Sequence, residues 1–341
     1  MQLDGREISI YSIRNSLDMM VSLSNYGARI VSLLVPDSTG KVADVVLGYD
    51  SIEHYPGSSE GYYGATIGRF GNRIANGTFA LDNVTYKLLK NDTKNHLHGG
   101  NRGFHSVVWK AFRAAENQVI FRHTFEDGED GYPGRLRVEV FFSLNDSGEL
   151  AINYQAVTDR KTIINLTNHA YFNLAGAGSG SVAGHLITIN ADSFTPVDEF
   201  MIPTGEIKKV AGTALDFRKE KPMGRDWDQD DPQLKIAGGY DHNFVLNKKA
   251  NGQAEFAARV TEPVSGRTLE VETTEPGLQF YTANALDGRD VGREGVPYEA
   301  RTAFCLETQH YPDSPNKPEF PSVLLEPGKP FKSTTIYRFS W

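Results

Sequence analysis

The chain has 341 residues, of which 39% are hydrophobic and 23% charged, a composition typical of a globular protein with a sizeable core. Its net charge of −8 argues against a nucleic-acid or anionic-membrane partner, because either would need a basic face. Cys305 is the only cysteine, which excludes an intrachain disulfide. The sequence has no apolar run long enough to span a membrane and begins without a signal-peptide pattern, so we expect a cytoplasmic protein.

Short β-rich runs separated by turn residues follow one another along almost the whole chain, and helical periodicity is nearly absent. We predict strands at 7–13, 19–23, 28–35, 43–47, 79–89 (a hairpin), 119–124, 135–144, 150–157, 187–189, 254–261, 268–273, 279–282, 303–307, 323–325 and 334–339. The irregular stretches 57–71 and 175–181 are interpreted as loops over one face. The aspartate-rich run 226–231 is interpreted as a solvated acidic loop.

This succession of strands, with 33 glycines and no alternation of strands and helices, predicts an antiparallel all-β sandwich or barrel. We find no linker, low-complexity segment or repeat in the sequence, so residues 1–341 are expected to form a single domain. In such a fold, residues far apart in sequence converge on one concave sheet. A functional site can therefore be assembled from pieces of the whole chain.

The stretch 163–175 begins like a buried strand and then becomes unusually polar. Within it lie Asn165, Asn168, His169, Tyr171 and Asn173. Polar groups clustered at a strand end cost desolvation energy unless each finds a partner. The partner is either a ligand covered in hydroxyls or the local backbone, and this stretch alone favours neither.

Two further polar clusters lie before residue 102. Arg69 and Arg73 stand in a glycine-rich turn, where their guanidinium groups either bind ligand oxygens or brace a loop through ion pairs. His96 and His98 are two residues apart, so on a strand both face the same side. That spacing suits a metal as well as a substrate, and a hydrogen-bonded structural imidazole is the simpler interpretation of either histidine alone.

Three more clusters lie in the last third of the chain. Asp241 precedes a histidine and an asparagine at the entrance to an apolar strand, and Gln279 lies among aromatic residues that are either core or a stacking surface for a sugar. Glu307 follows an apolar run, where burial would raise the pKa of an isolated carboxylate and suit it to general-base catalysis. A buried structural ion pair is the alternative for Glu307.

Six motifs occur in a fixed order along the chain. They are Gly-Arg-Phe-Gly-Asn-Arg-Ile around Asn72 and Arg73, Leu-His-Gly-Gly at His98, Asn-Leu-Thr-Asn-His-Ala-Tyr-Phe-Asn-Leu-Ala-Gly at His169, Asp-His-Asn-Phe at Asp241, Gly-Leu-Gln-Phe-Tyr-Thr at Gln279 and Leu-Glu-Thr-Gln at Glu307. Any one of them is a weak signal, whereas six in order are a strong one. With these motifs the chain resembles the galactose mutarotases (aldose 1-epimerases) along nearly its whole length.

The resemblance implies a large antiparallel β-supersandwich with few or no helices and a sugar cleft. It implies an isomerase that interconverts the α and β anomers of hexoses such as galactose and glucose, in hexose and galactose metabolism. Glu307 would be the general base, His169 the general acid, and His98 would contact the ring oxygen. The residues that would position the remaining hydroxyls are Asn72, Arg73, His98, Tyr171, Asp241 and Gln279.

No cofactor or metal is implied, and the partner would be a monosaccharide bound by a monomer or homodimer. Rival functions remain open at this point. They are a non-catalytic sugar-binding module, a glycosidase using Asp241 and Glu307, a metal enzyme built on His96, His98 and His169, and an enzyme acting on hexose 6-phosphates.

Overall fold

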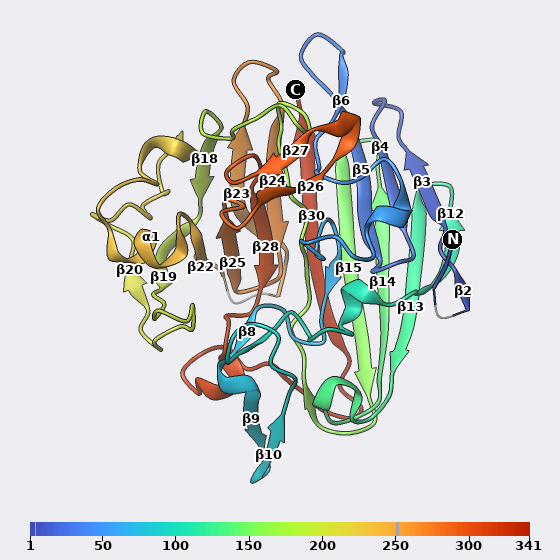
Figure 1. Ribbon diagram of the computed structural model, residues 1–341, viewed down its shortest axis with the longest axis vertical. Coiled ribbons are helices and arrows are strands. Elements are labelled where there is room, and N and C mark those ends of the chain that lie inside the picture. Colours follow the sequence, from blue (N-terminus) through green and yellow to red (C-terminus); the bar gives the residue numbers. More distant parts are fainter. Residues whose placement is uncertain (4, 250–251) are drawn as a thin grey trace.

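The computed structural model describes residues 1–3, 5–249 and 252–341, and its named strand pairs are all antiparallel (Figure 1). The largest sheet has nine strands. In spatial order they are β12 (Lys110–Ala115), β13 (Gln118–Phe125), β14 (Leu136–Leu144), β15 (Glu149–Thr158), β30 (Phe331–Ser340), β24 (Thr268–Thr273), β23 (Glu255–Thr261), β18 (Leu186–Ile189) and β21 (Lys221–Pro222).

Two smaller sheets complete the layers. A five-stranded sheet consists of β20 (Lys208–Lys209), β19 (Ala191–Thr195), β22 (Asp241–Leu246), β25 (Gly277–Tyr281) and β28 (Cys305–Gln309). A four-stranded sheet consists of β3 (Ile10–Arg14), β4 (Met20–Ser24), β5 (Arg29–Pro36) and β6 (Val42–Asp44).

Short strand pairs join the loops to these sheets. They are β1 (Gln2–Leu3) with β2 (Arg6–Glu7), β7 (Thr66–Ile67) with β17 (Thr167–Asn168), β8 (Arg73–Ile74) with β11 (His96–Leu97), β9 (Thr78–Leu81) with β10 (Val84–Lys87), β16 (Thr162–Ile163) with β29 (Leu324–Leu325), and β26 (Asp287–Val291) with β27 (Pro297–Glu299). Within the described ranges the only α-helix is α1 (Pro232–Ala237), and no helix is long and apolar enough to cross a membrane.

The core lies between the sheets because their strands bury alternate side chains. Along β14 every second residue is fully buried, as period-two apolar patterning requires. Val140 and Phe142 of β14 belong to the same apolar cluster as Phe244, Leu278 and Leu306 of the five-stranded sheet. The sheets therefore share one core, which confirms the predicted all-β supersandwich.

The prediction of a solvated acidic loop at 226–231 is wrong for its first residues. The Asp226 side chain is buried and accepts a 2.7 Å hydrogen bond from Nζ of Lys221, and Trp227 is buried as well. Asp231 at the other end caps helix α1, because its carboxylate accepts the backbone N–H of Gln233 at 2.8 Å. Local charge alone did not reveal these partners.

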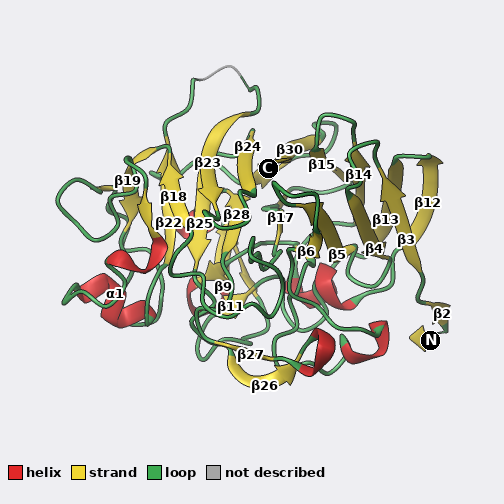
Figure 2. Ribbon diagram, turned by 90° about the horizontal axis from the view of Figure 1, so that it is seen from above, coloured by secondary structure: helices red, strands yellow, loops and turns green. Residues whose placement is uncertain are grey.

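The connecting loops and most of the short helical turns gather on one side of the strands (Figure 2). On this side lie β11 and the pair β26 and β27, and in the loop 57–65 the N–H of Ser59 donates to Asp290 of β26. Part of the predicted loop 57–71 is in fact strand β7, paired with β17. Segments far apart in sequence thus meet above the five-stranded sheet.

Candidate active site

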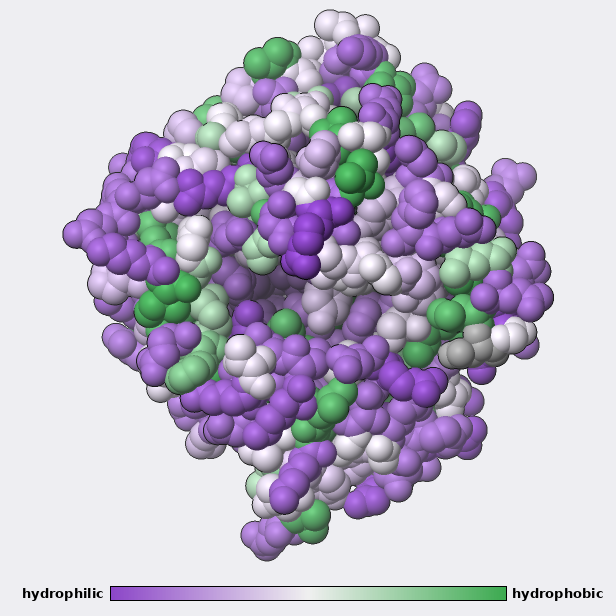
Figure 3. All heavy atoms as spheres, viewed as in Figure 1, coloured by the Kyte–Doolittle hydropathy of each residue, from purple (hydrophilic) through white to green (hydrophobic). Residues whose placement is uncertain are grey.

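A cavity of about 510 Å³ opens among these loops, and Figure 3 shows the hollow near the middle of the face turned to the reader. A volume of this size suits a small-molecule ligand. Its lining consists of Glu60, Tyr62, Asn72, Arg73, Leu97, His98, His169, Tyr171, Met201, Lys235, Ile236, Ala237, Gly238, Asp241, Tyr281, Asn284, Ala285 and Glu307. All the predicted site residues except Gln279 are among them.

The floor of the cavity is one face of the strands β22, β25 and β28. Pairing aligns Asp241 with Tyr281 and Gln279 with Glu307 across neighbouring strands. Because side chains alternate along a strand, these residues share one face and their neighbours share the other. The opposite face carries Phe280 and other apolar side chains of the core. The alternation thus places a polar face on the cavity.

Glu307 and His169 form a buried acid–base pair on this floor. Nε2 of His169 lies 3.5 Å from Oε1 of Glu307, and the side chains are only 5% and 3% exposed. Burial raises the pKa of Glu307 well above its ordinary value, and the charges of Asp241 and Glu60 raise it further against the opposing effect of Arg73. Burial lowers the pKa of His169 to about 3. Oε2 of Glu307 has no hydrogen-bond partner among the described residues.

Aromatic rings hold the imidazole of His169 in place. Tyr171 stacks on it with ring centroids 4.9 Å apart, and Tyr62 stacks at 5.7 Å. Its Nδ1 lies 3.6 Å from Sγ of Cys305, the fully buried thiol of β28. Burial raises the pKa of this thiol well above its ordinary value, so Cys305 packs against the histidine as a neutral group. His169 therefore has little freedom to rotate away from Glu307.

His98 has its tautomer set by the backbone. The N–H of Asn72 donates to its Nδ1 at 3.0 Å, and the N–H of His98 donates to the carbonyl of Asn72 at 3.2 Å. Burial lowers the pKa of His98 well below its ordinary value. A neutral imidazole that accepts at Nδ1 carries its proton on Nε2. His98 thus offers an N–H donor through Nε2.

One ring nitrogen each of His98 and His169 and one carboxylate oxygen of Glu307 lie within 4.8 Å of one another. Two histidines and one carboxylate are a common metal-ligand set. A metal on Nε2 of His98 would need the proton moved to Nδ1, where the N–H of Asn72 already donates. The backbone therefore disfavours coordination by this set.

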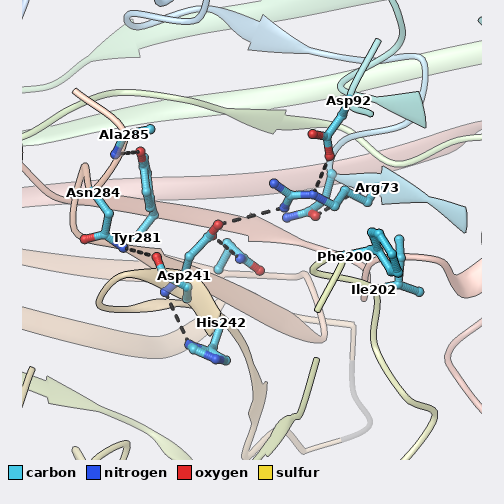
Figure 4. A network of polar contacts seen from close by, with 12 residues as sticks. Arg73, Asp92, Phe200, Ile202, Asp241, His242, Tyr281, Asn284 and Ala285 are labelled. Carbon is cyan, nitrogen blue, oxygen red and sulfur yellow. Dashed lines mark hydrogen bonds and ion pairs between the residues drawn. The ribbon is translucent and has the colours of Figure 1, made fainter. Parts of the chain in front are cut away.

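Arg73 and Asp241 face each other on one side of the cavity (Figure 4). Nε of Arg73 is 2.8 Å from Oδ2 of Asp92, and Nη1 lies 3.8 Å from Oδ2 of Asp241. Asp241 also accepts a 2.6 Å hydrogen bond from Nε2 of Gln279. Gln279 is buried behind Asp241 and does not line the cavity. The arrangement presents Arg73 and Asp241 as a donor and an acceptor for hydroxyls, with Gln279 orienting the acceptor.

Comparison with known proteins identifies the family of the chain. The family model for aldose 1-epimerase matches residues 9–338. The galactose mutarotase of Bos taurus is 48% identical over 94% of this chain and 91% of its own length, and that of Homo sapiens is 46% identical over 98% and 95%. The solved structure of an aldose epimerase homologue from C. elegans superposes with a TM-score of 0.88 at 32% identity, covering 98% of this chain and 99% of that one. The chain belongs to the aldose 1-epimerase family. Its classification as an isomerase, predicted from the sequence, is confirmed.

In this member of the aldose 1-epimerase family, three asparagines of the stretch 163–175 serve the architecture. Amide nitrogens of Asn165, Asn168 and Asn173 donate to the carbonyls of Gly71, Gly64 and Thr302, at 3.0, 2.9 and 2.9 Å. These side chains tie the stretch to loops far away in sequence. Their partners are backbone groups, and none of the three lines the cavity.

His96 is also a structural residue of this family member. Its Nδ1 lies 2.6 Å from the carbonyl of Leu89, and its Nε2 lies 2.6 Å from the hydroxyl of Tyr132. Both ring nitrogens are therefore occupied away from the cavity. A metal site that combines His96 with His98 and His169 does not form.

The lining residues that the sequence did not single out include Glu60 and Tyr62. Tyr281, one of the aromatic residues beside Gln279 that the sequence leaves as either core or a stacking surface for a sugar, lines the cavity. Glu60 and Tyr62 lie in the irregular stretch after residue 57, which shows no periodicity from which to infer an inward direction. Only the tertiary fold brings that loop onto His169.

Proposed function

We propose that this protein is an aldose 1-epimerase that interconverts the α and β anomers of hexoses such as galactose and glucose. The observation that carries the proposal is the buried pair of His169 and Glu307, 3.5 Å apart, in a cavity lined by hydroxyl-binding groups. Mutarotation needs one proton removed from an oxygen and another delivered to a neighbouring oxygen, and a positioned acid–base pair does both. A monosaccharide is thus the proposed partner.

The reaction follows from the positions of these groups. The carboxylate of Glu307 takes the proton of the anomeric hydroxyl, the bond between the anomeric carbon and the ring oxygen breaks, and the ring oxygen takes a proton from His169. The resulting aldehyde turns about its neighbouring carbon–carbon bond. The hydroxyl formed from the ring oxygen then attacks the other face of the aldehyde and returns its proton to His169. Glu307 returns the first proton to the former aldehyde oxygen, which becomes the anomeric hydroxyl again.

The other predicted site residues have supporting roles in this proposal. His98 donates a hydrogen bond through its Nε2–H in the region of the ring oxygen. Asn72, Arg73, Tyr171 and Asp241 hold the far hydroxyls, while Gln279 orients Asp241 through its 2.6 Å hydrogen bond. Hydrogen bonds to the hydroxyls far from the anomeric carbon fix the sugar while leaving the aldehyde group free to rotate. The place in cytoplasmic hexose and galactose metabolism stays a prediction.

The decisive experiment replaces the base. Glu307→Gln keeps the size of the side chain and removes its ability to take a proton. We expect the catalysed rate of α-galactose mutarotation, followed in a polarimeter, to fall by about 10²–10⁴-fold with little change in sugar binding. Glu53→Gln is the control, because Glu53 is exposed and lies outside the cavity. Wild-type turnover in Glu307→Gln would contradict the assignment.

A further inference from the structure

Besides Glu307 and Asp241, a third carboxyl group reaches the cavity, from a loop that carries none of the family motifs. Glu60 lies between the short helical turn Ile52–His54 and strand β7, and it lines the same cavity as Glu307 and His169. Neither the mechanism nor the proposed set of hydroxyl-binding residues uses it. Its position in the wall of a sugar cavity therefore needs its own explanation.

The backbone at Glu60 is held firmly by Asp290 of β26. The N–H and the hydroxyl of Ser59 donate to Asp290 at 3.0 and 2.7 Å, and the N–H of Glu60 donates to it at 3.0 Å. One carboxylate thus accepts three hydrogen bonds from two consecutive residues. Because the loop is fixed at this point, the side chain of Glu60 has a defined direction.

The carboxyl group of Glu60 is only partly satisfied by the protein. The hydroxyl of Tyr171 and the backbone N–H of Tyr62 hydrogen-bond to it, whereas its Oε1 is buried and has no partner within the described residues. Burial raises the pKa of Glu60 to about 7, and its charge in turn raises the pKa of Glu307. A buried acceptor without a donor is costly. A ligand hydroxyl in the cavity would supply that donor.

We propose that Glu60 is a specificity-determining residue that accepts a hydrogen bond from one non-anomeric hydroxyl of the bound sugar. This inference rests on the proposed function, since it takes a monosaccharide as the ligand. The enzyme would then not accept every hexose equally well. The preferred ligand is a sugar that carries a hydroxyl where Glu60 meets the ring, and the corresponding deoxy sugar is discriminated against.

The competing explanation is that Glu60 only braces Tyr171, which stacks on His169 at 4.9 Å. The two explanations differ in how they treat substrates. A brace lowers the rate for every sugar by the same factor. A direct contact matters only for sugars that possess the contacted hydroxyl. The effects on kcat/KM of removing the Glu60 side chain and of removing that hydroxyl are therefore not additive.

The test is a cycle of enzyme variants and deoxy sugars. Wild type, Glu60→Ala and Glu60→Gln are assayed by polarimetry with galactose and its 2-, 3-, 4- and 6-deoxy derivatives. For one deoxy sugar we expect the wild-type kcat/KM to fall by about 10- to 100-fold, the range for a hydrogen bond to a charged group. Glu60→Ala loses a similar factor on galactose and nothing further on that deoxy sugar. Glu60→Gln keeps an acceptor oxygen and falls in between.

Glu53→Gln is the matched control, because Glu53 is an exposed glutamate of the preceding helical turn, outside the cavity. It should behave as wild type with every sugar. Equal losses in Glu60→Ala for all five sugars, or no loss at all, would overturn the proposal. If Glu60→Ala melts below the assay temperature, Glu60→Gln decides alone through the same cycle. A wild type that leaves all five sugars unchanged would instead refute the proposed function.

Discussion

Burial acts on Glu307 and His169 in opposite directions, and the two groups face each other across 3.5 Å. The pKa of Glu307 is raised well above its ordinary value, and that of His169 is lowered to about 3. Over the pH range between these two values the pair holds one proton. Moving that proton from the carboxyl to the imidazole prepares a base and an acid together, without exchange with solvent.

This shared proton leads to a prediction about pH. Above the raised pKa of Glu307 the pair has lost its proton, and the acid for the ring oxygen is missing. We therefore expect the catalysed kcat/KM to fall as the pH rises through the raised pKa of Glu307. Polarimetry from pH 6 to pH 10, with the spontaneous rate subtracted, measures the profile. A rate that rises with pH and stays high would show that the carboxylate works without a protonated partner.

At the scale of the element, strand β28 has two different faces. Glu307 points to the cavity, and Leu306 belongs to the apolar core with 1% of its surface exposed. The flanking strand β25 repeats the pattern with Tyr281, which lines the cavity, and Phe280, which belongs to the core. One short strand thus faces the cavity on one side and the core on the other.

The two faces should respond separately to substitution. Leu306→Ala leaves a cavity in the core and should lower the free energy of unfolding by about 2–5 kcal/mol, measured by urea denaturation, with kcat changed less than threefold. Glu307→Gln should do the reverse, losing kcat while keeping most of the stability. A large loss of kcat in Leu306→Ala at unchanged stability would mean that the faces are coupled.

Strands with clear alternation were predictable from the sequence, and strands without it were not. The predicted 135–144 and 150–157 correspond to β14 and β15, where apolar and polar residues alternate. Strand β12 (Lys110–Ala115) was missed, because its alanines and charged residues have low β-propensity and its place at the sheet edge demands little burial. Strand β19 (Ala191–Thr195) was missed as well, although its pairing with β22 gives it a place in the sheet.

Cavity residues could be predicted from the sequence only where they lie in a recognisable motif. Asp241 and Glu307 stand at fixed places in recognisable strand motifs. Glu60 does not, since its burial comes from Asp290 and Tyr171, which are 230 and 111 positions away in the chain. Gln279 was predicted to contact the sugar, but it lies behind the cavity wall and hydrogen-bonds to Asp241. Whether a side chain lines a cavity or only contacts a lining residue depends on packing, which the local sequence pattern does not contain.

At the scale of the whole molecule, burial keeps most of the histidines neutral. Seven of the nine have a pKa lowered by burial. They are His96, His98, His105, His123, His169, His185 and His242. In the unfolded chain each would titrate near pH 6.5. Below that pH the unfolded state binds protons that the folded state does not, so folding becomes less favourable.

We therefore expect an acid-sensitive fold. The free energy of unfolding should decrease as the pH falls below about 6.5, with a slope of up to about 1.4 kcal/mol per pH unit for each such histidine. Thermal unfolding followed by circular dichroism between pH 8 and pH 5 measures the trend. A melting temperature that is highest at pH 5 would contradict it.

His310 provides the matched control with the opposite sign. It lies 2.6 Å from the buried Glu275, whose charge outweighs burial and raises the pKa of His310. Its contribution to stability is complete below the unfolded pKa near 6.5 and is lost as the pH rises through the folded pKa. His310→Gln should thus destabilise the protein more at pH 6 than at pH 9.

Strand β30 lies between β15 and β24 in the nine-stranded sheet, although it is formed by residues 331–340. Until it is inserted, the sheet remains in two parts, each with an open edge of unpaired N–H and carbonyl groups. During synthesis the other strands of the sheet leave the ribosome before β30, so β15 and β24 cannot be joined until β30 has emerged. The enzyme therefore completes its largest sheet only after residues 331–340 have emerged, and until then a chaperone would protect the unpaired edges of β15 and β24.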